Sequence, residues 1–421
     1  MKNEDKKDFK SYANSFQAVT VPGLSRVRAL CDALGNPERF MKFIHIDGTN
    51  GKGSTSECMA CILEDAGYTV GKFISPNLIK VNERISVGGE DISDAELKEI
   101  LDTIEPHSKE VERITGLYPT QFEIWTAAAL LYFKRKKCDY VVLEVGLGGE
   151  LDATNIIPEN EIAIITRLGL DHTQYLGNTI GEVACAKAGI LKPTGGTRAL
   201  ITPRQDKDAM SVIEKRASEL GISIIVPEYI HTGKNGIFER FSIDGIGEIE
   251  CGISGLHQIE NASLAAEAAR ALGIAPEHII SGIGRSRNPA RFELIEKDPD
   301  VIYDGGHNEN GIEALVRSLD RYYGSVPKTV IFACMSDKKI DDSLRMLSEG
   351  KTEFIFTTVK DNPRAGSAKS LWERAAAIGY EGVAEEDIGR AYELARSKGN
   401  LTLICGSLYL YRDLREYLDR R

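Results

Sequence analysis

A glycine-rich segment that follows a short apolar stretch is the first feature of this sequence able to do chemistry. Residues 43–47 are apolar apart from His45 and Asp47, and a helix is predicted after the segment. Glycines let backbone N–H groups approach phosphate oxygens, and a helix start adds positive potential. Lys52 would reach the β- and γ-phosphates of a nucleotide, and Ser54 would ligate Mg²⁺. The predicted phosphate loop consists of Gly48, Thr49, Asn50, Gly51, Lys52, Gly53 and Ser54.

The spacing of this loop differs from the general phosphate-loop pattern. The glycines are closer together, and Gly53 separates Lys52 from Ser54. The alternative is a plain glycine-rich turn between a strand and a helix. The lysine and the hydroxyl at the predicted helix start favour the phosphate-binding interpretation.

Two more polar side chains follow predicted strands. Glu144 lies near the end of the apolar run 140–145, and His172 comes after the run 162–166. Open α/β sheets bind their ligands at the carboxyl ends of the strands. A carboxylate there, together with Ser54, suits Mg²⁺, which prefers oxygen ligands. A lone histidine at a strand end is more often structural.

The elements that must position these residues alternate between strand and helix, which is typical of doubly wound α/β layers. We predict a P-loop, doubly wound α/β domain over residues 1–288 and a smaller α/β domain over residues 289–421. The first has predicted strands at 43–47, 140–145, 162–166 and 222–226, helices at 54–66, 122–134, 209–220 and 261–272, and antiparallel strands within 238–251. The second has predicted strands at 301–303, 329–333, 354–357 and 401–405, a helix at 311–322 and a closing helix.

Composition excludes several other classes. The net charge of −11 disfavours a nucleic-acid-binding protein, which would carry a basic face. No apolar run is long enough to span a bilayer, and the polar N-terminus lacks a secretory signal, so we expect a cytoplasmic protein. The C-x-x-C pair Cys58 and Cys61 has no second pair to complete a zinc site, and both residues are predicted to be thiols in the core.

A series of ordered motifs resembles the folylpolyglutamate synthase/dihydrofolate synthase family of the Mur ligase superfamily. After the phosphate loop these are Phe73-Ile74-Ser75-Pro76-Asn77-Leu78, Asn82-Glu83-Arg84-Ile85, Leu143-Glu144-Val145-Gly146-Leu147-Gly148-Gly149 and Leu151-Asp152-Ala153-Thr154-Asn155. The similarity runs from about residue 20 to the C-terminus. It implies a monomeric ligase that uses ATP to add L-glutamate to a folate, or to dihydropteroate, through an acyl phosphate.

The resemblance also implies a metal site. One Mg²⁺ would be held by Ser54 and Glu144, and a second by Glu144, His172 and Ser75. In the family the lysine that matches Lys187 is carbamylated, and the carbamate supports the second metal. Without the resemblance, Lys187 would be interpreted as a solvated helix lysine. A monovalent cation is also allowed by the resemblance.

Five residues are expected on the nucleotide side. The resemblance places Gln258 and Asn261 at the adenine, although Asn261 alone would equally suit a helix cap. Arg291 would contact the γ-phosphate and stabilise charge on the transferring phosphoryl group. Asp304 would accept from ribose hydroxyls, and His307 would lie near the phosphates.

Several positions depart from the family pattern. They are Asn77 (usually His), Glu150 (usually Arg), Ala186 (usually Glu) and Ala290 (usually Gly). Glu150, Ala186 and Ala290 leave open a weakly active or regulatory nucleotide-binding paralogue. A Mur-type ligase with a non-folate acceptor is a separate alternative. Gln174 replaces an acidic residue of many bifunctional members, which predicts that a reduced folate is a better acceptor than dihydropteroate unless Gln174 faces solvent.

Overall fold

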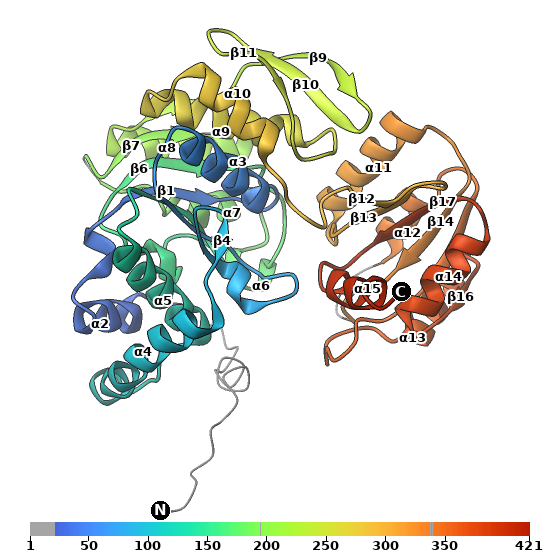
Figure 1. Cartoon of the computed structure of the whole chain (residues 1–421), viewed down its shortest axis with the longest axis horizontal. Coiled ribbons are helices and arrows are strands. Elements are labelled where there is room, and N and C mark those ends of the chain that lie inside the picture. Colours follow the sequence, from blue (N-terminus) through green and yellow to red (C-terminus); the bar gives the residue numbers. More distant parts are fainter. Residues whose placement is uncertain (1–21, 194, 337, 339) are drawn as a thin grey trace, which may run out of the picture. The chain divides into compact units, whose positions relative to one another are not determined.

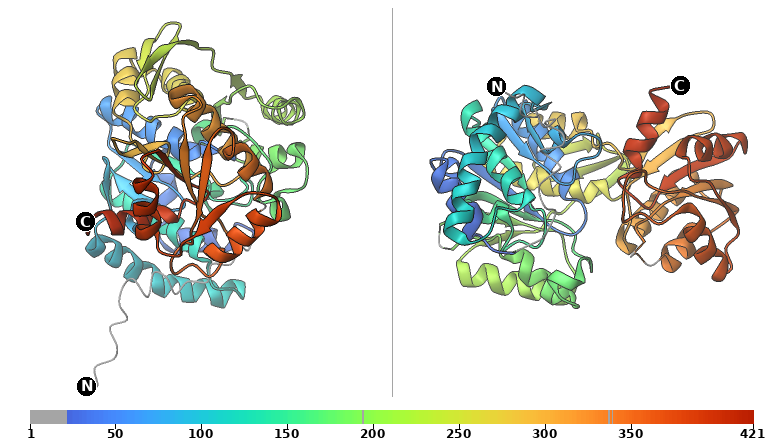
Figure 2. Two further views of the ribbon diagram at one scale, coloured as in Figure 1. Left: turned by 90° about the vertical axis from the view of Figure 1, so that its right-hand side faces the viewer. Right: turned by 90° about the horizontal axis from the view of Figure 1, so that it is seen from below.

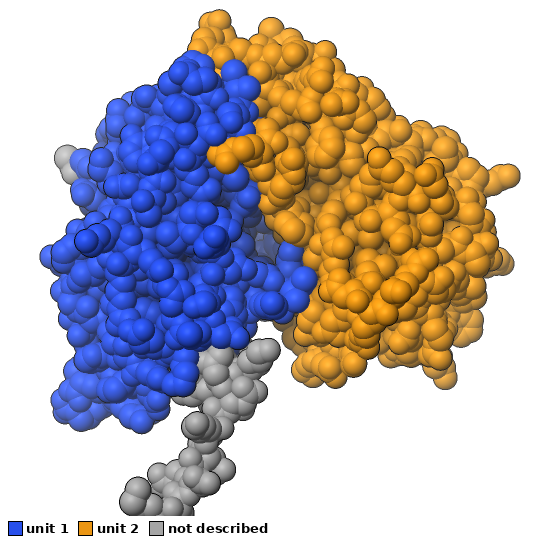
Figure 3. Space-filling view, in the orientation of Figure 1, with its two compact units in different colours: residues 1–228, 263–283 blue, residues 229–262, 284–421 orange. Residues whose placement is uncertain are grey.

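The computed structural model describes residues 22–193, 195–336, 338 and 340–421, whose helices and strands can be followed in Figures 1 and 2. The chain forms two compact units, coloured separately in Figure 3. Unit 1 contains the described residues up to Glu228 together with Ser263–Ile283, and unit 2 contains Tyr229–Ala262 and Gly284–Arg421. The domain boundary near residue 289 stays a prediction, and residues 229–262 belong to unit 2 although they precede it.

Unit 1 is built on an eight-stranded sheet with the order β4-β3-β2-β5-β1-β6-β7-β8. The strands from β2 to β8 in this order pair in parallel, and β3 and β4 form an antiparallel edge. Their bounds are β1 Lys42–Asp47, β2 Val70–Phe73, β3 Ile85–Val87, β4 Glu90–Asp91, β5 Tyr140–Glu144, β6 Asn160–Ile165, β7 Thr197–Ile201 and β8 Ser223–Ile225. The central strands are buried on both faces, which explains why they appear in the sequence as short continuous apolar runs.

Helices cover the sheet of unit 1. Apolar residues of α2 (Ser25–Ala33), α4 (Asp94–Thr115) and α5 (Gln121–Lys136) share one core with side chains of β1, β2 and β5. The other helices of this part of the chain are α3 (Lys52–Asp65), α6 (Thr173–Leu176), α7 (Ile180–Ala188), α8 (Lys207–Leu220), α9 (Gln258–Leu272) and α10 (Pro276–Arg285), with 3₁₀ turns at Pro37–Arg39, Val81–Arg84 and Ala153–Ile156. A Cβ on Gly282 of α10 would lie 2.5 Å from Ile62 Cα of α3, so these two helices pack backbone to backbone.

Unit 2 contains a six-stranded sheet and a small antiparallel one. The larger sheet has the order β12-β13-β17-β14-β15-β16, and only β12 is antiparallel to its neighbour. Its elements are β12 Glu293–Glu296, β13 Val301–Asp304, α11 Glu309–Tyr323, β14 Lys328–Phe332, α12 Asp341–Leu347, β15 Thr352–Phe356, α13 Ala368–Ala377, β16 Gly382–Ala384, α14 Ile388–Ser397, β17 Leu401–Cys405 and α15 Leu410–Leu418. The small sheet is formed by β9 Ile230–Asn235, β10 Phe238–Ile243 and β11 Gly247–Glu250.

The predicted fold class is confirmed, since two α/β units are present and every strand range predicted from the sequence overlaps an observed strand. Helix α4 was not predicted. Its capping box between Ser93 and Glu96 and its C-terminal Gly116 are signals that the sequence does contain. Cys58 and Cys61 lie in α3 as predicted, and neither takes part in a disulfide. None of the helices in the described part of the chain is long and apolar enough to cross a membrane.

An ion cluster attaches the small sheet to α11 within unit 2. The fully buried Glu239 of β10 accepts from His231 Nε2 at 2.6 Å and from Arg321 Nε at 3.2 Å. Burial would raise the pKa of the Glu239 carboxyl, but these partners hold that pKa below its ordinary value. The cluster therefore stabilises unit 2 as long as Glu239 is ionised.

We expect the cluster to make stability pH-dependent. Because the folded-state pKa of Glu239 is lowered, its contribution is complete above the unfolded-state value of about 4.3 and is lost as pH falls through the folded-state pKa. Glu239→Gln should cost about 1–3 kcal/mol at pH 7 and should lose less stability than the wild type on acidification below about pH 4. Thermal unfolding followed by circular dichroism measures both effects.

Glu250 on the same sheet provides the control, because its partner Arg240 is exposed. Glu250→Gln should change the stability of the protein little. Parallel pH profiles of wild type and Glu239→Gln would contradict this prediction.

Candidate functional site

The predicted site residues of unit 1 follow four neighbouring parallel strands. These strands lie in the order β2-β5-β1-β6, and their carboxyl ends therefore meet at one edge of the sheet. Ser75 follows β2, Glu144 ends β5, the phosphate loop follows β1, and His172 lies in the segment after β6. Ile46 of β1 pairs in register with Glu144, so the loop and the carboxylate leave the sheet at the same level.

The loop between β1 and α3 has a backbone that requires glycine. Gly48 has φ +147°, and a Cβ there would lie 1.8 Å from Thr166 Oγ1 of the segment after β6. Gly51 precedes the first residue of α3 with φ 92°, in the left-handed region. The first turn of α3, from Lys52 to Ser54, directs its N–H groups towards this loop, which is the arrangement that binds anions at helix starts.

Hydrogen bonds brace the loop. The backbone N–H groups of Thr49 and Asn50 both donate to the carbonyl of Arg167 at 3.1 Å. Thr49 Oγ1 donates to the Gly169 carbonyl at 2.9 Å, and Lys52 Nζ donates to the Gly48 carbonyl at 3.1 Å. The side chain of Lys52 thus lies across the loop, where its ammonium group can bind phosphate oxygens.

The metal-ligand candidates differ in burial. Ser54 and Glu144 are buried, whereas His172 is exposed in a left-handed conformation at φ 50°. Among the described residues, no three or more His, Cys, Asp or Glu side chains gather as a metal cluster. A Mg²⁺ that is shared with nucleotide phosphates needs only one or two carboxylates and keeps several waters, so Ser54 and Glu144 fit such an ion.

Lys187 is buried, and the solvated alternative is wrong. Only 4% of Lys187 is exposed, and its Nζ donates to Asp47 Oδ1 at 2.8 Å. Asp47, the last residue of β1, is fully buried and also accepts from the Gly48 N–H at 2.6 Å. Burial raises the pKa of the Asp47 carboxyl, and the charges of Lys187 and Lys52 act against that rise. Asp47 was not predicted as a site residue, although its place directly before the phosphate loop was a signal.

Two of the departures from the family pattern lie beside this pair. The N–H of Glu150 donates to the Ala186 carbonyl at 3.1 Å. Gly149, which precedes Glu150, has no room for a side chain. A Cβ there would lie 2.5 Å from the Ala186 carbonyl oxygen and 2.8 Å from Asp47 Oδ2. The segments that carry Asp47, Gly149, Glu150, Ala186 and Lys187 are therefore closely packed around one point.

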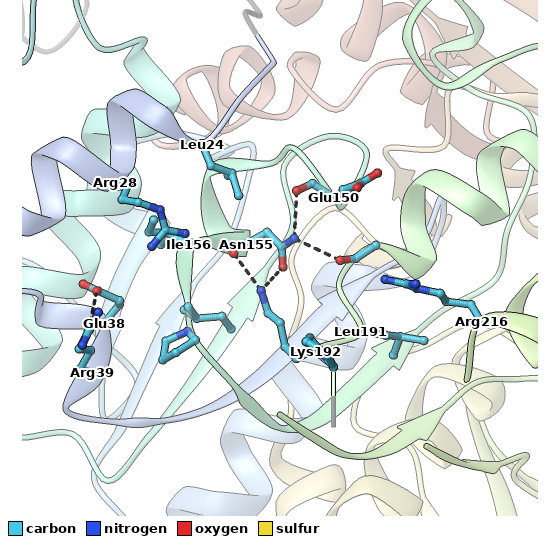
Figure 4. Close-up of a pocket in the computed structure, with 14 residues that line it drawn as sticks. Leu24, Arg28, Glu38, Arg39, Glu150, Asn155, Ile156, Leu191, Lys192 and Arg216 are labelled. Carbon is cyan, nitrogen blue, oxygen red and sulfur yellow. Dashed lines mark hydrogen bonds and ion pairs between the residues drawn. The ribbon is translucent and has the colours of Figure 1, made fainter. Parts of the chain in front are cut away.

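A cavity of about 380 Å³ in unit 1 is bordered by Glu150 and by several basic residues, including Arg28 and Lys192 (Figure 4). The buried Lys192 donates to the carbonyl and side-chain oxygens of Asn155 at 2.9 and 2.6 Å. Burial, with a contribution from Arg28, lowers the pKa of Lys192 to about 8. Asn155 Nδ2 also donates to the carbonyls of Glu150 and Gly189, so these bonds hold the loop after β5 against the end of α7.

A buried chain of hydrogen-bonded polar groups connects the loop after β5 to strand β1. Thr154 Oγ1 lies 2.9 Å from His45 Nε2 of β1 and donates to Asp152 Oδ1 at 2.5 Å. Asp152 also accepts from the Leu147 N–H at 2.9 Å, and burial raises the pKa of its carboxyl to about 6. The contact between His45 and Thr154 joins residues 109 positions apart in sequence, and it was not predicted.

The predicted residues of unit 2 surround the end of β13. Asp304 accepts from the N–H groups of Phe292 at 2.8 Å and Gly306 at 2.7 Å. His307 Nδ1 lies 3.0 Å from the Gly305 carbonyl, and a Cβ on Gly305 would lie 3.2 Å from Arg291 Nη1. Asp304, Arg291 and His307 thus belong to one cluster.

Ala290 shows why glycine suits its position. It has φ +61°, in the left-handed region, which costs an alanine about 1 kcal/mol or more. Its N–H donates to Glu293 Oε2 at 2.7 Å, and its carbonyl accepts from the Gly305 N–H at 2.9 Å. The loop that carries Arg291 therefore keeps the glycine-like backbone in spite of the substitution.

Gln258 and Asn261 lie together at the start of α9. Asn261 Nδ2 donates to Gln258 Oε1 at 2.9 Å, and both residues are buried. Since α9 begins at Gln258, Asn261 lies inside the helix and is not its cap. Gln258 Nε2 is 3.0 Å from His257 Nε2, and His257 is close enough to Asp304 and Arg291 for their charges to affect its pKa, which burial lowers. Gln258 and Asn261, the residues predicted to contact adenine, therefore lie near Asp304 and Arg291 within unit 2.

Comparison with known proteins finds two family domains in this chain. Residues 46–269 match the Mur ligase middle domain, and residues 290–408 match the Mur ligase glutamate ligase domain. These two matches place the chain in the class of ATP-dependent Mur-type ligases.

Individual relatives narrow this class. The Bacillus subtilis dihydrofolate synthase/folylpolyglutamate synthase is 35% identical over 415 residues, which cover 94% of this chain and 95% of the relative. The Lacticaseibacillus casei folylpolyglutamate synthase is 31% identical, with 97% of each chain covered. Mycobacterium tuberculosis folylpolyglutamate synthase complexed with ADP and AMPPCP matches with a TM-score of 0.88 and 28% identity, covering 95% of this chain and 96% of that chain. The protein belongs to the folylpolyglutamate synthase/dihydrofolate synthase family of the Mur ligase superfamily.

Proposed function

We propose that this protein uses ATP and Mg²⁺ to join the amino group of L-glutamate to the carboxylate of a folate. The observation that carries the proposal is the convergence of the phosphate loop, Glu144, Ser75 and the His172 segment at the ends of four adjacent parallel strands. The folate carboxylate would attack the γ-phosphate to give an acyl phosphate and ADP. The glutamate amine would then attack the acyl carbon and release phosphate.

Each group has a defined part in this proposal. Lys52 and the N–H groups at the start of α3 would bind the phosphates, and Arg291 would stabilise charge on the transferring phosphoryl group. Gln258, Asn261, Asp304 and His307 would contact the adenosine or the phosphates. Ser54 and Glu144 would hold one Mg²⁺, and Ser75 and His172 would add ligands for a second. Bound Mg²⁺ would neutralise charge on the transferring phosphoryl group.

The carbamylated Lys187 that the resemblance implies is not part of this proposal. Lys187 Nζ already donates to the carboxylate of Asp47, and a carbamate would place a second anion there. We also propose that the protein acts as a monomer in the cytoplasm, without a nucleic-acid or membrane partner.

The acceptor can be a reduced folate alone or dihydropteroate as well. The relatives include proteins named for both activities and one named for folylpolyglutamate synthesis alone. Gln174 lies exposed on α6, which favours the alternative that it faces solvent. A Gln174 side chain that faces solvent would not select between the two acceptors.

An assay of ADP release tests the proposed function. Release should require a folate acceptor, L-glutamate and Mg²⁺ together, and mass spectrometry should show a product heavier by one glutamyl residue. A Mur-type ligase with a non-folate acceptor would bind ATP yet release no ADP with tetrahydrofolate or dihydropteroate. A regulatory paralogue would bind ATP with no acceptor-dependent turnover of any kind. Either result would overturn the proposal.

A further inference from the structure

Asp47 and Lys187 form a buried ion pair that joins two elements of the site. Asp47 ends β1 directly before the phosphate loop, and Lys187 lies in α7, 140 residues later. The exposed fractions of their side chains are 0% and 5%, and their nearest oxygen and nitrogen are 2.8 Å apart. A pair this well buried remains in place because removing one partner would leave the other charge without compensation.

The surroundings of the pair leave little place for another anion. Asp47 Oδ1 is occupied by Lys187 Nζ and by the Gly48 N–H. Asp47 Oδ2 is buried and accepts no hydrogen bond from any described residue. A Cβ on Gly149 would lie 2.8 Å from that oxygen and 3.0 Å from Lys187 Cα, so the space beside the pair is filled by backbone.

Carbamylation would change the charge of the Lys187 side chain beside Asp47 from positive to negative. A neutral lysine amine attacks CO₂, a new N–C bond forms, and one proton is released to water as the amine becomes an anionic carbamate. In this chain the product would place that anion beside the Asp47 carboxylate, in a site where like charges are screened little. The reactant is also disfavoured, because Lys187 Nζ already donates a hydrogen bond to the Asp47 carboxylate and would have to give up this contact to attack CO₂.

The departures from the family pattern occur at the same point. Ala186, where the family usually has Glu, precedes Lys187, and its carbonyl accepts from the N–H of Glu150, where the family usually has Arg. An acidic and a basic side chain are therefore missing beside Lys187, and a carboxylate is present at Asp47. In this chain the carboxylate that lies beside Lys187 is that of Asp47.

We propose that Lys187 acts unmodified in this protein, and that Asp47 is the positioning residue that holds its ammonium group beside the phosphate loop in place of a carbamate. The proposal rests on the proposed function for the identity of the site. Its test uses no ATP, folate or glutamate, and for this reason it can fail while the ligase activity stands.

The experiment measures carbamate on Lys187 directly. Purified full-length protein is incubated with ¹³C-bicarbonate, carbamates are trapped by alkylation with a trialkyloxonium salt, and the digested peptide that contains Lys187 is analysed by mass spectrometry. Wild type should show no more label on this peptide than a Lys187→Arg variant. Asp47→Ala and the nearly isosteric Asp47→Asn should both gain label, because the amine loses its anionic partner. A matched variant, Asp65→Ala, removes an aspartate of α3 that contacts His278, and it should stay unlabelled.

Two outcomes would overturn the proposal. Label on Lys187 in the wild-type protein would show that the modification forms despite Asp47. An unlabelled Lys187 in folded Asp47→Ala and Asp47→Asn would show that Asp47 is not the group that prevents it. Circular dichroism of each variant confirms that the protein is folded, and the two substitutions at Asp47 keep the test valid if one of them fails to fold.

Discussion

Replacing Lys52 by alanine should lower the ligation rate by a factor on the order of 10³ or more, because a charge fixed at the transferring phosphoryl group is lost. Lys52 is only half-buried and its Nζ contacts loop carbonyls, so the fold should remain intact. ADP release gives the rate, and thermal unfolding gives the stability. Lys52→Arg should recover only part of the activity, since a guanidinium keeps the charge and not the shape of the ammonium.

The exposed Lys109 of α4 provides the control for this experiment. Its side chain forms a surface ion pair with Glu105, and Lys109→Ala should leave both rate and stability nearly unchanged. A Lys52→Ala protein that is folded and as active as the wild type would remove the phosphate-loop assignment.

The second large effect is expected at Glu144. Glu144→Gln keeps the size of the side chain and removes the charge that Mg²⁺ prefers in a ligand. We expect ligation to fall by a factor on the order of 10² or more at ordinary Mg²⁺ concentrations. Part of the loss should be recovered as Mg²⁺ is raised, because the remaining phosphate and Ser54 ligands still bind the ion. Initial rates measured across a Mg²⁺ series separate weaker metal binding from a slower chemical step.

Glu267 is the matched control for Glu144, because it is another buried glutamate of unit 1. It lies on α9, beside Arg270, and burial raises the pKa of its carboxyl. Glu267→Gln should therefore leave the dependence of the rate on Mg²⁺ unchanged. If Glu144→Gln showed the same Mg²⁺ dependence as the wild type, Glu144 would not be a metal ligand.

The sequence by itself determined the elements and the loop of this protein. Short apolar runs predicted β1, β5 and β6, because strands buried on both faces cannot carry polar side chains without cost. The glycines at 48 and 51 predicted the phosphate loop, since few other residues tolerate the backbone that it needs. Polar residues placed directly after these strands could be assigned to one sheet edge, because parallel strands end together.

The tertiary structure decided which of these residues meet and in what state. Residues 229–262 belong to unit 2, where Glu239 binds Arg321 of α11 across 82 residues of sequence. Lys187 looked like a solvated helix lysine, yet the packing of α7 against the end of β1 buries it and gives it Asp47 as a partner. The pairing of Asp47 with Lys187 has no local signal, because the energy of an ion pair depends on distance and burial. Both arise only when the strand order β5-β1-β6 brings the two segments together.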